Sequence, residues 1–420
     1  MSEKRQRKQQ RRQRRKASGA RRNASPDRVL AEVARLAAGS VTEVPDAFTA
    51  EQWASNLLST WQREAPPGEP IDAGLFQAFA RALQRVGTPG ALTALRSLNA
   101  IGTPTVAGIA QDAAQPLVGL EQPAWIDELG QARPVGAALL DEPAFDDGFS
   151  VMLEFAEPAG EHHTLSVYID HNLGGIVKDV LLADTIDQVR ARMDTSPERD
   201  RVVFRDLDLG EARARVEAAL DALDHTYEPP VDEDVFSLRA LIEARLRLLP
   251  AGVEWRLPYE ELPQAERDRL LADFLESDDG RRWRDDEVAE YVAQLAIDFG
   301  ADYNHGGPLR WSAVVVEIFM LDWLARKVSE EAEFFARVPD VLADWVRYAG
   351  RRRGVPDELV REAAAAVEAY RGEMLEAVTD PASWGPAKLF ATAATEAGVD
   401  LSDPAAVERF VEEYNRRYAG

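Results

Sequence analysis

The sequence predicts an α+β fold that is mostly α-helical, with a small antiparallel-sheet domain in the middle and an all-α C-terminal domain. Apolar residues recur at helical spacing before about residue 121 and after about residue 231, whereas between these points they alternate with polar residues. A chain of 420 residues exceeds the size of a single core, which stops growing at roughly 250–300 residues. We therefore expect a basic arm over 1–24, a helical domain over 25–120, the α+β domain over 121–230 and the all-α domain over 231–420.

The N-terminal helices are predicted from apolar periodicity and from their capping residues. The first should begin at Ser25, as N-cap, with Pro26 at the first helical position. Two amphipathic helices follow over 49–63 and 72–86, and two more should open at Thr88-Pro89 and at Thr103-Pro104. These segments account for the domain over 25–120.

The middle of the chain reads as strands. Apolar residues alternate with polar ones over 149–156 and 164–170, and an apolar run follows over 176–182. Short turns join the three segments, which predicts an antiparallel meander with flanking strands near 133–140 and 201–206. Helices over 185–194 and 209–223 are expected to cover one face, and the order of the outer strands stays open.

The remaining chain is predicted to be helical throughout, over 234–248, 264–276, 285–299, 309–326, 329–349, 356–378, 385–397 and 403–417. The helix over 309–326 is apolar on nearly all sides, so we expect it to be the central, buried helix of the C-terminal domain.

Two segments of the C-terminal half, 301–312 (ADYNHGGPLRWS) and 384–388 (WGPAK), are similar to stretches of uncharacterised protein families of high-GC actinobacteria. The resemblance covers about the C-terminal half of the chain. It implies no activity and supplies no functional residues.

Composition excludes several kinds of site. The chain has no cysteine, which excludes disulfides, thiolate metal sites and a Cys nucleophile. The P-loop, dinucleotide-binding, zinc-protease and nucleophile-elbow motifs are absent. The most apolar stretch, 311–324, is shorter than the roughly 20 residues that a bilayer requires, and no apolar segment follows the basic N-terminus as in a signal peptide. We expect a cytoplasmic protein with no membrane partner, cofactor or metal.

The arm carries the strongest charge signal. Eleven of the first 22 residues are basic, against the single acid Glu3, and the eleven are Lys4, Arg5, Arg7, Lys8, Arg11, Arg12, Arg14, Arg15, Lys16, Arg21 and Arg22. The arm thus carries a charge of +10. Of the chain's 49 basic and 73 acidic residues, 38 and 72 remain for residues 23–420, which therefore carry −34.

This asymmetry indicates a class of partner, because clustered Arg and Lys neutralise phosphates and release counterions. The leading hypothesis is a non-enzymatic protein whose arm, disordered when free, engages RNA, DNA or another polyanion. No aromatic residue lies in the arm, so base stacking is excluded. The alternatives are a solvated or self-docking tail and a protein-interaction scaffold.

A second hypothesis is a hydrolase-like enzyme with an acid–base centre near Glu317, Asp302 and His305. Asp302-x-Asn304-x-Gly306 resembles the start of a calcium loop, but Ala313 occupies the position of the bidentate Glu. Glu317 has apolar neighbours on its helix, which predicts a buried carboxylate with a raised pKa. The alternative is a structural ion pair with Arg310 or another arginine.

The remaining titratable cluster comprises His162, His163, Tyr168, Asp170 and His171. Strand alternation places His163 and His171 on one face, about 26 Å apart along one strand, which is too far for a shared metal. The residues after His171 read more simply as a hairpin turn, with Asn172 and Gly174 supplying positive φ.

Overall fold

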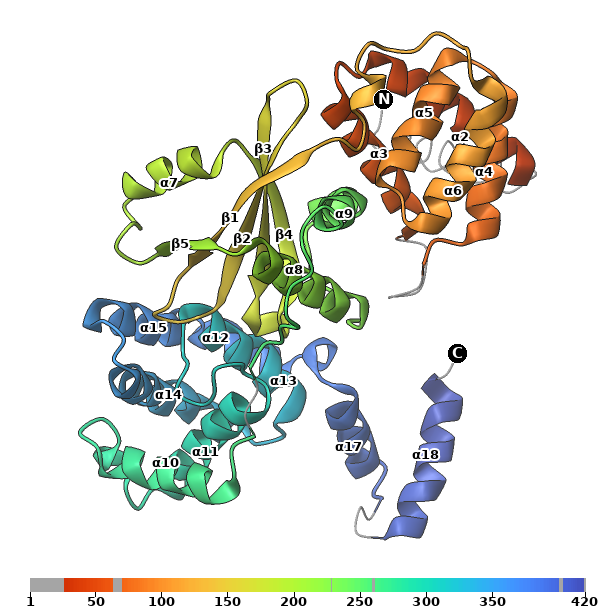
Figure 1. Ribbon diagram of the computed structural model, residues 1–420. Coiled ribbons are helices and arrows are strands. Elements are labelled where there is room, and N and C mark those ends of the chain that lie inside the picture. Colours follow the sequence, from red (N-terminus) through yellow and green to blue (C-terminus); the bar gives the residue numbers. More distant parts are fainter. Residues whose placement is uncertain (1–25, 63–69, 228, 259–260, 400–402, 419–420) are drawn as a thin grey trace, which may run out of the picture. The chain divides into compact units, whose positions relative to one another are not determined.

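The structure is a computed structural model that describes residues 26–62, 70–227, 229–258, 261–399 and 403–418 (Figure 1). The described part is mostly helical, with a single five-stranded antiparallel sheet in the middle of the chain and helices at its C-terminal end. The predicted fold class is therefore confirmed.

The backbone contacts divide the chain into two compact units. Unit 1 comprises Met1–Leu140, Ser150–Ile169 and Ile176–Arg256, and unit 2 comprises Asp141–Phe149, Asp170–Gly175 and Leu257–Gly420. This division falls at other positions than the domain boundaries expected at 120 and 230.

The first helices of unit 1 follow the predicted pattern. They are α2 (Pro26–Ser40), α3 (Ala47–Gln62), α4 (Ala73–Val86), α5 (Pro89–Ile101) and α6 (Pro104–Ala114), with short 3₁₀ turns η1 (Val41–Glu43), η2 (Gln115–Leu117) and η3 (Ile126–Glu128). Thr88 and Thr103 cap α5 and α6 through their hydroxyls, which accept from the amides of Ala91 and Val106. The predicted cap Ser25 lies outside the described residues.

The sheet contains β1 (Arg133–Asp141), β2 (Gly148–Ala156), β3 (His162–Asp170), β4 (Ile176–Ala183) and β5 (Val203–Leu207), in the order β4-β3-β2-β1-β5. The first four strands form the predicted meander. The order of the outer strands, which sequence left open, is resolved by β5 pairing with β1.

Both faces of the sheet are covered by helices of unit 1. On one face, Ile186 and Val189 of α7 (Ile186–Asp194) pack with Ala138 and Met152. On the other, Arg245 of α9 (Glu233–Leu246) lies over Phe155 of β2.

Helix α9 (Glu233–Leu246) has α8 (Leu209–Asp224) beside it, joined by an ion pair between Arg239 and Asp224 (Figure 1). The prediction that the helices over 185–194 and 209–223 share one face is therefore wrong. The reason is that β2 is apolar on both sides, with Met152 facing α7 and Val151 and Leu153 buried on the other face.

Helix α9 was expected in the all-α C-terminal domain, but it packs against α3 inside unit 1. The backbone amide of Leu241 donates to the hydroxyl of Ser55 at 3.1 Å. This contact places α9 beside α3, which precedes it by more than 170 residues in the chain.

Unit 2 is built from helices: α10 (Gln264–Glu276), α11 (Glu287–Asp302), α12 (Ala313–Glu317), a π-helical segment η6 (Ile318–Trp323), α13 (Leu324–Lys327), α14 (Ala332–Arg353), α15 (Asp357–Ala369), α16 (Arg371–Thr379), α17 (Pro386–Glu396) and α18 (Pro404–Tyr418). Short 3₁₀ turns lie at η4 (His171–Leu173), η5 (Arg281–Trp283) and η7 (Pro381–Ser383). The helices expected over 309–326 and 356–378 are each interrupted, the first by the π-helical segment and the second at Tyr370.

The central helix of unit 2 is α14. It buries Val338, Val341, Leu342 and Trp345 at helical spacing in the main core of the unit. The segment 309–326, which was expected to be central, is buried on one side only, as the 42% exposure of Val314 shows. No helix among the described residues is long and apolar enough to cross a membrane.

Candidate functional site

The three residues of the predicted acid–base centre each have a different environment. Asp302 is exposed and pairs with Arg267, which lowers the pKa of the Asp302 carboxyl. His305 is half-buried, and burial together with the nearby His171 and Arg310 lowers its pKa.

Glu317 is exposed, not buried as expected, and it accepts a hydrogen bond from the hydroxyl of Tyr370 at 2.9 Å. The apolar sequence around Glu317 misled the prediction because Val314, one turn earlier on the same side, is exposed as well. No hydrogen bond or ion pair joins any two of Asp302, His305 and Glu317 in the contacts described for this part of the chain. The three residues therefore do not form a shared acid–base centre by direct contact.

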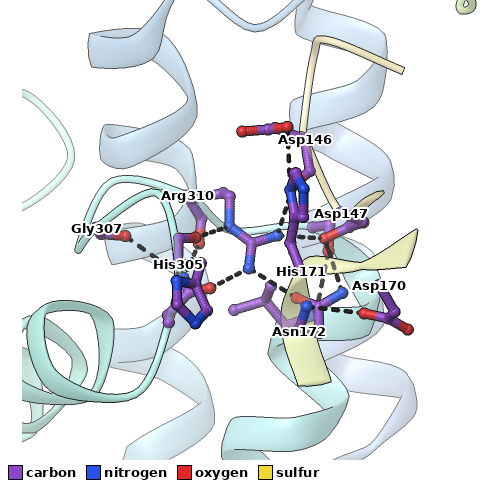
Figure 2. A network of polar contacts seen from close by, with 11 residues as sticks. Asp146, Asp147, Asp170, His171, Asn172, His305, Gly307 and Arg310 are labelled. Atoms are coloured by element: carbon purple, nitrogen blue, oxygen red, sulfur yellow. Dashed lines mark hydrogen bonds and ion pairs between the residues drawn. The ribbon is translucent and has the colours of Figure 1, made fainter. Parts of the chain in front are cut away.

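Arg310 is the fully buried centre of a polar network in unit 2 (Figure 2). Its Nη1 donates to Asp147 Oδ1 at 2.6 Å, and its Nη2 donates to Asn172 Oδ1 at 2.7 Å. Nη2 also donates to Asn304, and Nε donates to the carbonyl of His305. All three guanidinium nitrogens therefore have acceptors, as a buried cation requires.

A second layer of contacts holds the acceptors in place. Asp147 Oδ1 also accepts from the hydroxyl of Ser312 at 2.9 Å and from Asn172 Nδ2 at 3.2 Å. Nearby, His171 Nδ1 lies 3.2 Å from Asp146 Oδ1. Burial alone would raise the pKa of Asp146, but His171, Arg310 and Arg353 outweigh it, so the pKa is lowered.

The glycines of segment 301–312 are explained by this network. Gly306 has a φ of +88°, and a Cβ there would lie 2.8 Å from Arg310 Cδ. Asn304, which the sequence suggested as a calcium ligand, donates instead to the carbonyl of Arg310 at 2.8 Å. We interpret the Arg310 network as structural, because its charged groups satisfy one another and fix the segments 141–149 and 170–175 within unit 2.

The two adjacent histidines of β3 point to opposite faces of the sheet. His162 Nδ1 lies 2.7 Å from Glu154 Oε1, and Glu154 Oε2 accepts from the backbone amide of Ile186 at 2.9 Å. His163 faces α9 and stacks on Phe48, with ring centroids 3.9 Å apart. Among the described residues, no group of three or more His, Asp or Glu side chains could hold a metal ion.

A second buried ionic cluster surrounds Arg245, which is 1% exposed. Its Nη2 lies 2.6 Å from Glu51 Oε2 and 2.9 Å from Glu157 Oε1. Its Nε donates to His163 Nε2 at 3.3 Å. Three separate parts of unit 1, namely α3, the β2–β3 hairpin and α9, thus meet at one guanidinium.

This environment shifts two protonation equilibria away from their ordinary ranges. Burial raises the pKa of Glu157 from 4.5 to about 7, with Glu51 and Asp46 adding to the effect and Arg245 opposing it. Burial, Arg245 and His162 lower the pKa of His163 to about 3. His163 is therefore neutral, and its Nε2 must be the acceptor because a guanidinium can only donate.

A half-open cavity of about 790 Å³ lies beside this cluster, entirely within unit 1. Its walls include Phe48, Glu157, His163, Met152 and, from α7, Met193. The volume is in the range of small-molecule sites. The arrangement can bind a polar organic ligand and exchange a proton with it near neutral pH.

Sequence analysis did not find the Arg245 cluster. Glu51, Glu157 and Arg245 are far apart in the chain, and their meeting depends on tertiary structure. One signal was present in the sequence: Glu51 lies on the same face of α3 as Ala47, Ala54 and Leu58, which are among the buried residues of this helix. An acid on the apolar face of a helix must be paired or protonated when buried.

Comparison with protein-family models, with curated proteins and with solved structures found no match to this chain.

Proposed function

We propose that the chain binds a polyanion, RNA or DNA backbone in particular, through its basic arm. The observation that carries the proposal is the charge split, +10 on residues 1–22 and −34 on the rest of the chain. The arm, residues 1–24, lies outside the described residues, so the proposal rests on its composition. It involves no catalytic step.

The ion pairs of the folded units support assigning this role to the arm. Arg245 and Arg310 are buried with carboxylates, and Arg239 is held by Asp224 and Glu243. Some arginines at the surface are paired too, for example Arg96 with Asp127. Because the acidic body repels phosphates, the segment with an excess of cationic residues, 1–24, is the part expected to attract them.

Binding through such a segment has a defined signature. Each phosphate neutralised releases counterions, so the logarithm of the affinity falls linearly with the logarithm of the salt concentration. With no aromatic residue for base stacking, we expect little dependence on nucleotide sequence.

The test measures binding of labelled single-stranded RNA and duplex DNA to the full chain across a salt series. Up to about ten phosphate contacts give a slope of about −9 for duplex DNA. A variant lacking residues 1–24 should lose the binding, whereas a variant with the arm's residues in shuffled order should keep it. Equal affinity and slope with and without the arm would contradict the proposal.

The alternative acid–base centre near Glu317, Asp302 and His305 receives no support from the geometry, because each residue has its own partners. A role as a protein-interaction scaffold remains the other alternative, and no observation in the folded units favours it.

A further inference from the structure

The Arg245 cluster has one more carboxylate than its cations can pair. Glu51 and Glu157 share the single guanidinium of Arg245, and His163 contributes no charge because its Nε2 accepts from that guanidinium. A buried carboxylate without its own counter-charge is costly. The excess charge is removed either by a proton on Glu157 or by a cation from outside.

Three buried atoms of the cluster have no hydrogen-bond partner, namely Glu51 Oε2, Glu157 Oε2 and His163 Nδ1. Glu51 Oε2 lies 2.6 Å from Arg245 Nη2, and His163 Nδ1 lies 3.3 Å from Glu157 Oε1, which leaves Glu157 Oε2 with neither kind of contact. Glu157 is 7% exposed, and both it and His163 line the cavity. Buried polar atoms of this kind are rare, and each calls for a partner that reaches it.

The rest of the cavity has the composition expected of a site for an organic cation. Glu161 and Asp184 add carboxylates to its walls, which contain one arginine and no lysine among the lining residues; that arginine, Arg192, lies 3.5 Å from Asp184. Apolar and polarisable side chains make up much of the remainder, among them Phe48, Leu140, Met152, Val189 and Met193. Aromatic rings and thioethers pack well against the apolar body of a ligand.

We propose that this cavity binds a small organic amine, with its ammonium group paired to Glu157 and its apolar body against the apolar wall beside it, which includes Phe48. The proposal concerns unit 1 alone and is independent of polyanion binding by the arm.

The protonation of Glu157 makes the expected binding dependent on pH. The groups that face Glu157 are Arg245 from α9, Glu51 and Asp46 from α3 and the turn before it, and His163 from β3. An alkylammonium stays charged below about pH 10, so the charge of this ion pair changes between pH 6 and 8 through Glu157, whose pKa is about 7. The amine should displace the proton of Glu157 and bind about tenfold more tightly at pH 8 than at pH 6.

The methionines provide a direct readout in the full chain. Of the five, Met152 and Met193 line the cavity, whereas Met320 and Met374 lie in the core of unit 2. With methionine methyls labelled with ¹³C, we would titrate benzylamine and 4-phenylbutylamine, each beside the corresponding neutral alcohol. We expect the Met152 and Met193 signals to shift with the amines, more strongly at pH 8, while Met320 and Met374 stay unchanged and the alcohols have at least tenfold weaker effects.

The decisive variant is Glu157→Gln, with Glu121→Gln as its matched control, because Glu121 is an exposed glutamate of unit 1 that does not line the cavity. Gln imitates the protonated acid that is already populated near pH 7, so the variant should fold, which the Met152 and Met193 signals report. Glu157→Gln should weaken amine binding at least tenfold and abolish its pH dependence, whereas Glu121→Gln should change the affinity less than threefold. The proposal is overturned if neither amine shifts Met152 or Met193 at millimolar concentration, if the alcohols bind as well, or if wild-type binding does not depend on pH.

Discussion

At the scale of single residues, the two buried arginines illustrate two ways of keeping a charge inside a protein. Arg310 has an acceptor for each guanidinium nitrogen and a carboxylate, Asp147, that is itself held by Ser312 and Asn172. Arg245 instead stands between two carboxylates and a neutral histidine. The first arrangement is complete, and the second leaves one carboxylate that responds to pH or to a ligand.

The raised pKa of Glu157 predicts how stability changes with pH. Because the folded-state pKa is about 7 against an ordinary value of 4.5, the folded protein holds this proton more tightly than the unfolded chain. The stabilisation of the folded state by this proton is present in full below pH 4.5, and it is lost as the pH rises through about 7. Between pH 5 and pH 8 this amounts to about 2 kcal/mol.

We expect Glu157→Gln to lack the decrease in stability that the wild type shows between pH 5 and pH 8, since an amide does not ionise. Urea unfolding at pH 5, 6.5 and 8 should show the variant gaining stability relative to the wild type as the pH rises. Glu161→Gln, which removes a charge at an exposed position, is the control and should follow the wild type. A constant difference between Glu157→Gln and the wild type at all three pH values would show that Glu157 titrates normally.

At the scale of elements, the loop between α11 and α12 depends on two glycines with the same backbone conformation. Gly306 has a φ of +88° and Gly307 a φ of +80°, so alanine is strained at both. Only Gly306 also approaches Arg310, whereas a Cβ at Gly307 would meet nothing within 4 Å. Comparing alanine substitutions at the two positions therefore distinguishes the effect of backbone strain from the effect of a steric clash with Arg310.

Gly306→Ala should therefore destabilise the protein by about 2 kcal/mol more than Gly307→Ala, because Arg310 is fixed by its hydrogen bonds and cannot move aside cheaply. Chemical denaturation of the two variants in parallel measures the difference. Equal losses would mean that the side chain of Arg310 adjusts freely, against the interpretation of the network as rigid.

Sequence periodicity predicted most elements, and its failures have identifiable physical causes. The helix expected over 264–276 coincides with α10, because its apolar face and polar ends agree. The helix over 309–326 was predicted as continuous, since a π-helical segment changes the backbone hydrogen bonding without changing the apolar pattern. The exposed side of α12 could not be predicted either, because it carries Val314 as well as Glu317.

The candidate site was less predictable than the fold. His163 was identified as notable, but its partners Arg245 and Glu157 were not, since local patterns do not show which distant segments meet. In the segment 301–312, Asn304 was suggested as a calcium ligand, whereas in the structure its side chain hydrogen-bonds with Arg310.

At the scale of the whole molecule, the backbone contacts divide the chain into two units. We expect a destabilising substitution in one unit to lower the stability of that unit first. Arg310→Met removes the cation from a buried network in unit 2 and should cost about 3 kcal/mol there. In a urea titration of the variant, the ¹³C-methyl signals of Met320 and Met374 should reach their unfolded positions at lower urea than those of Met152 and Met193. Arg326→Met, which removes an exposed partner of Asp322, should leave both midpoints unchanged. If the signals of Met152, Met193, Met320 and Met374 all change at one urea midpoint in Arg310→Met, the two units unfold together.

The chain passes between the two units at residues 140, 149, 169, 175 and 256, and this has a consequence for synthesis on the ribosome. Unit 1 has all of its residues once Arg256 has emerged, whereas the segments 141–149 and 170–175 emerge early and belong to unit 2. Asp147 and Asn172 therefore lack Arg310 as a hydrogen-bond donor until it is translated, more than a hundred residues later. A nascent chain stalled between Arg256 and Arg310 would contain all residues of unit 1, but its loops 141–149 and 170–175 would lack the ion pair and hydrogen bonds of Arg310.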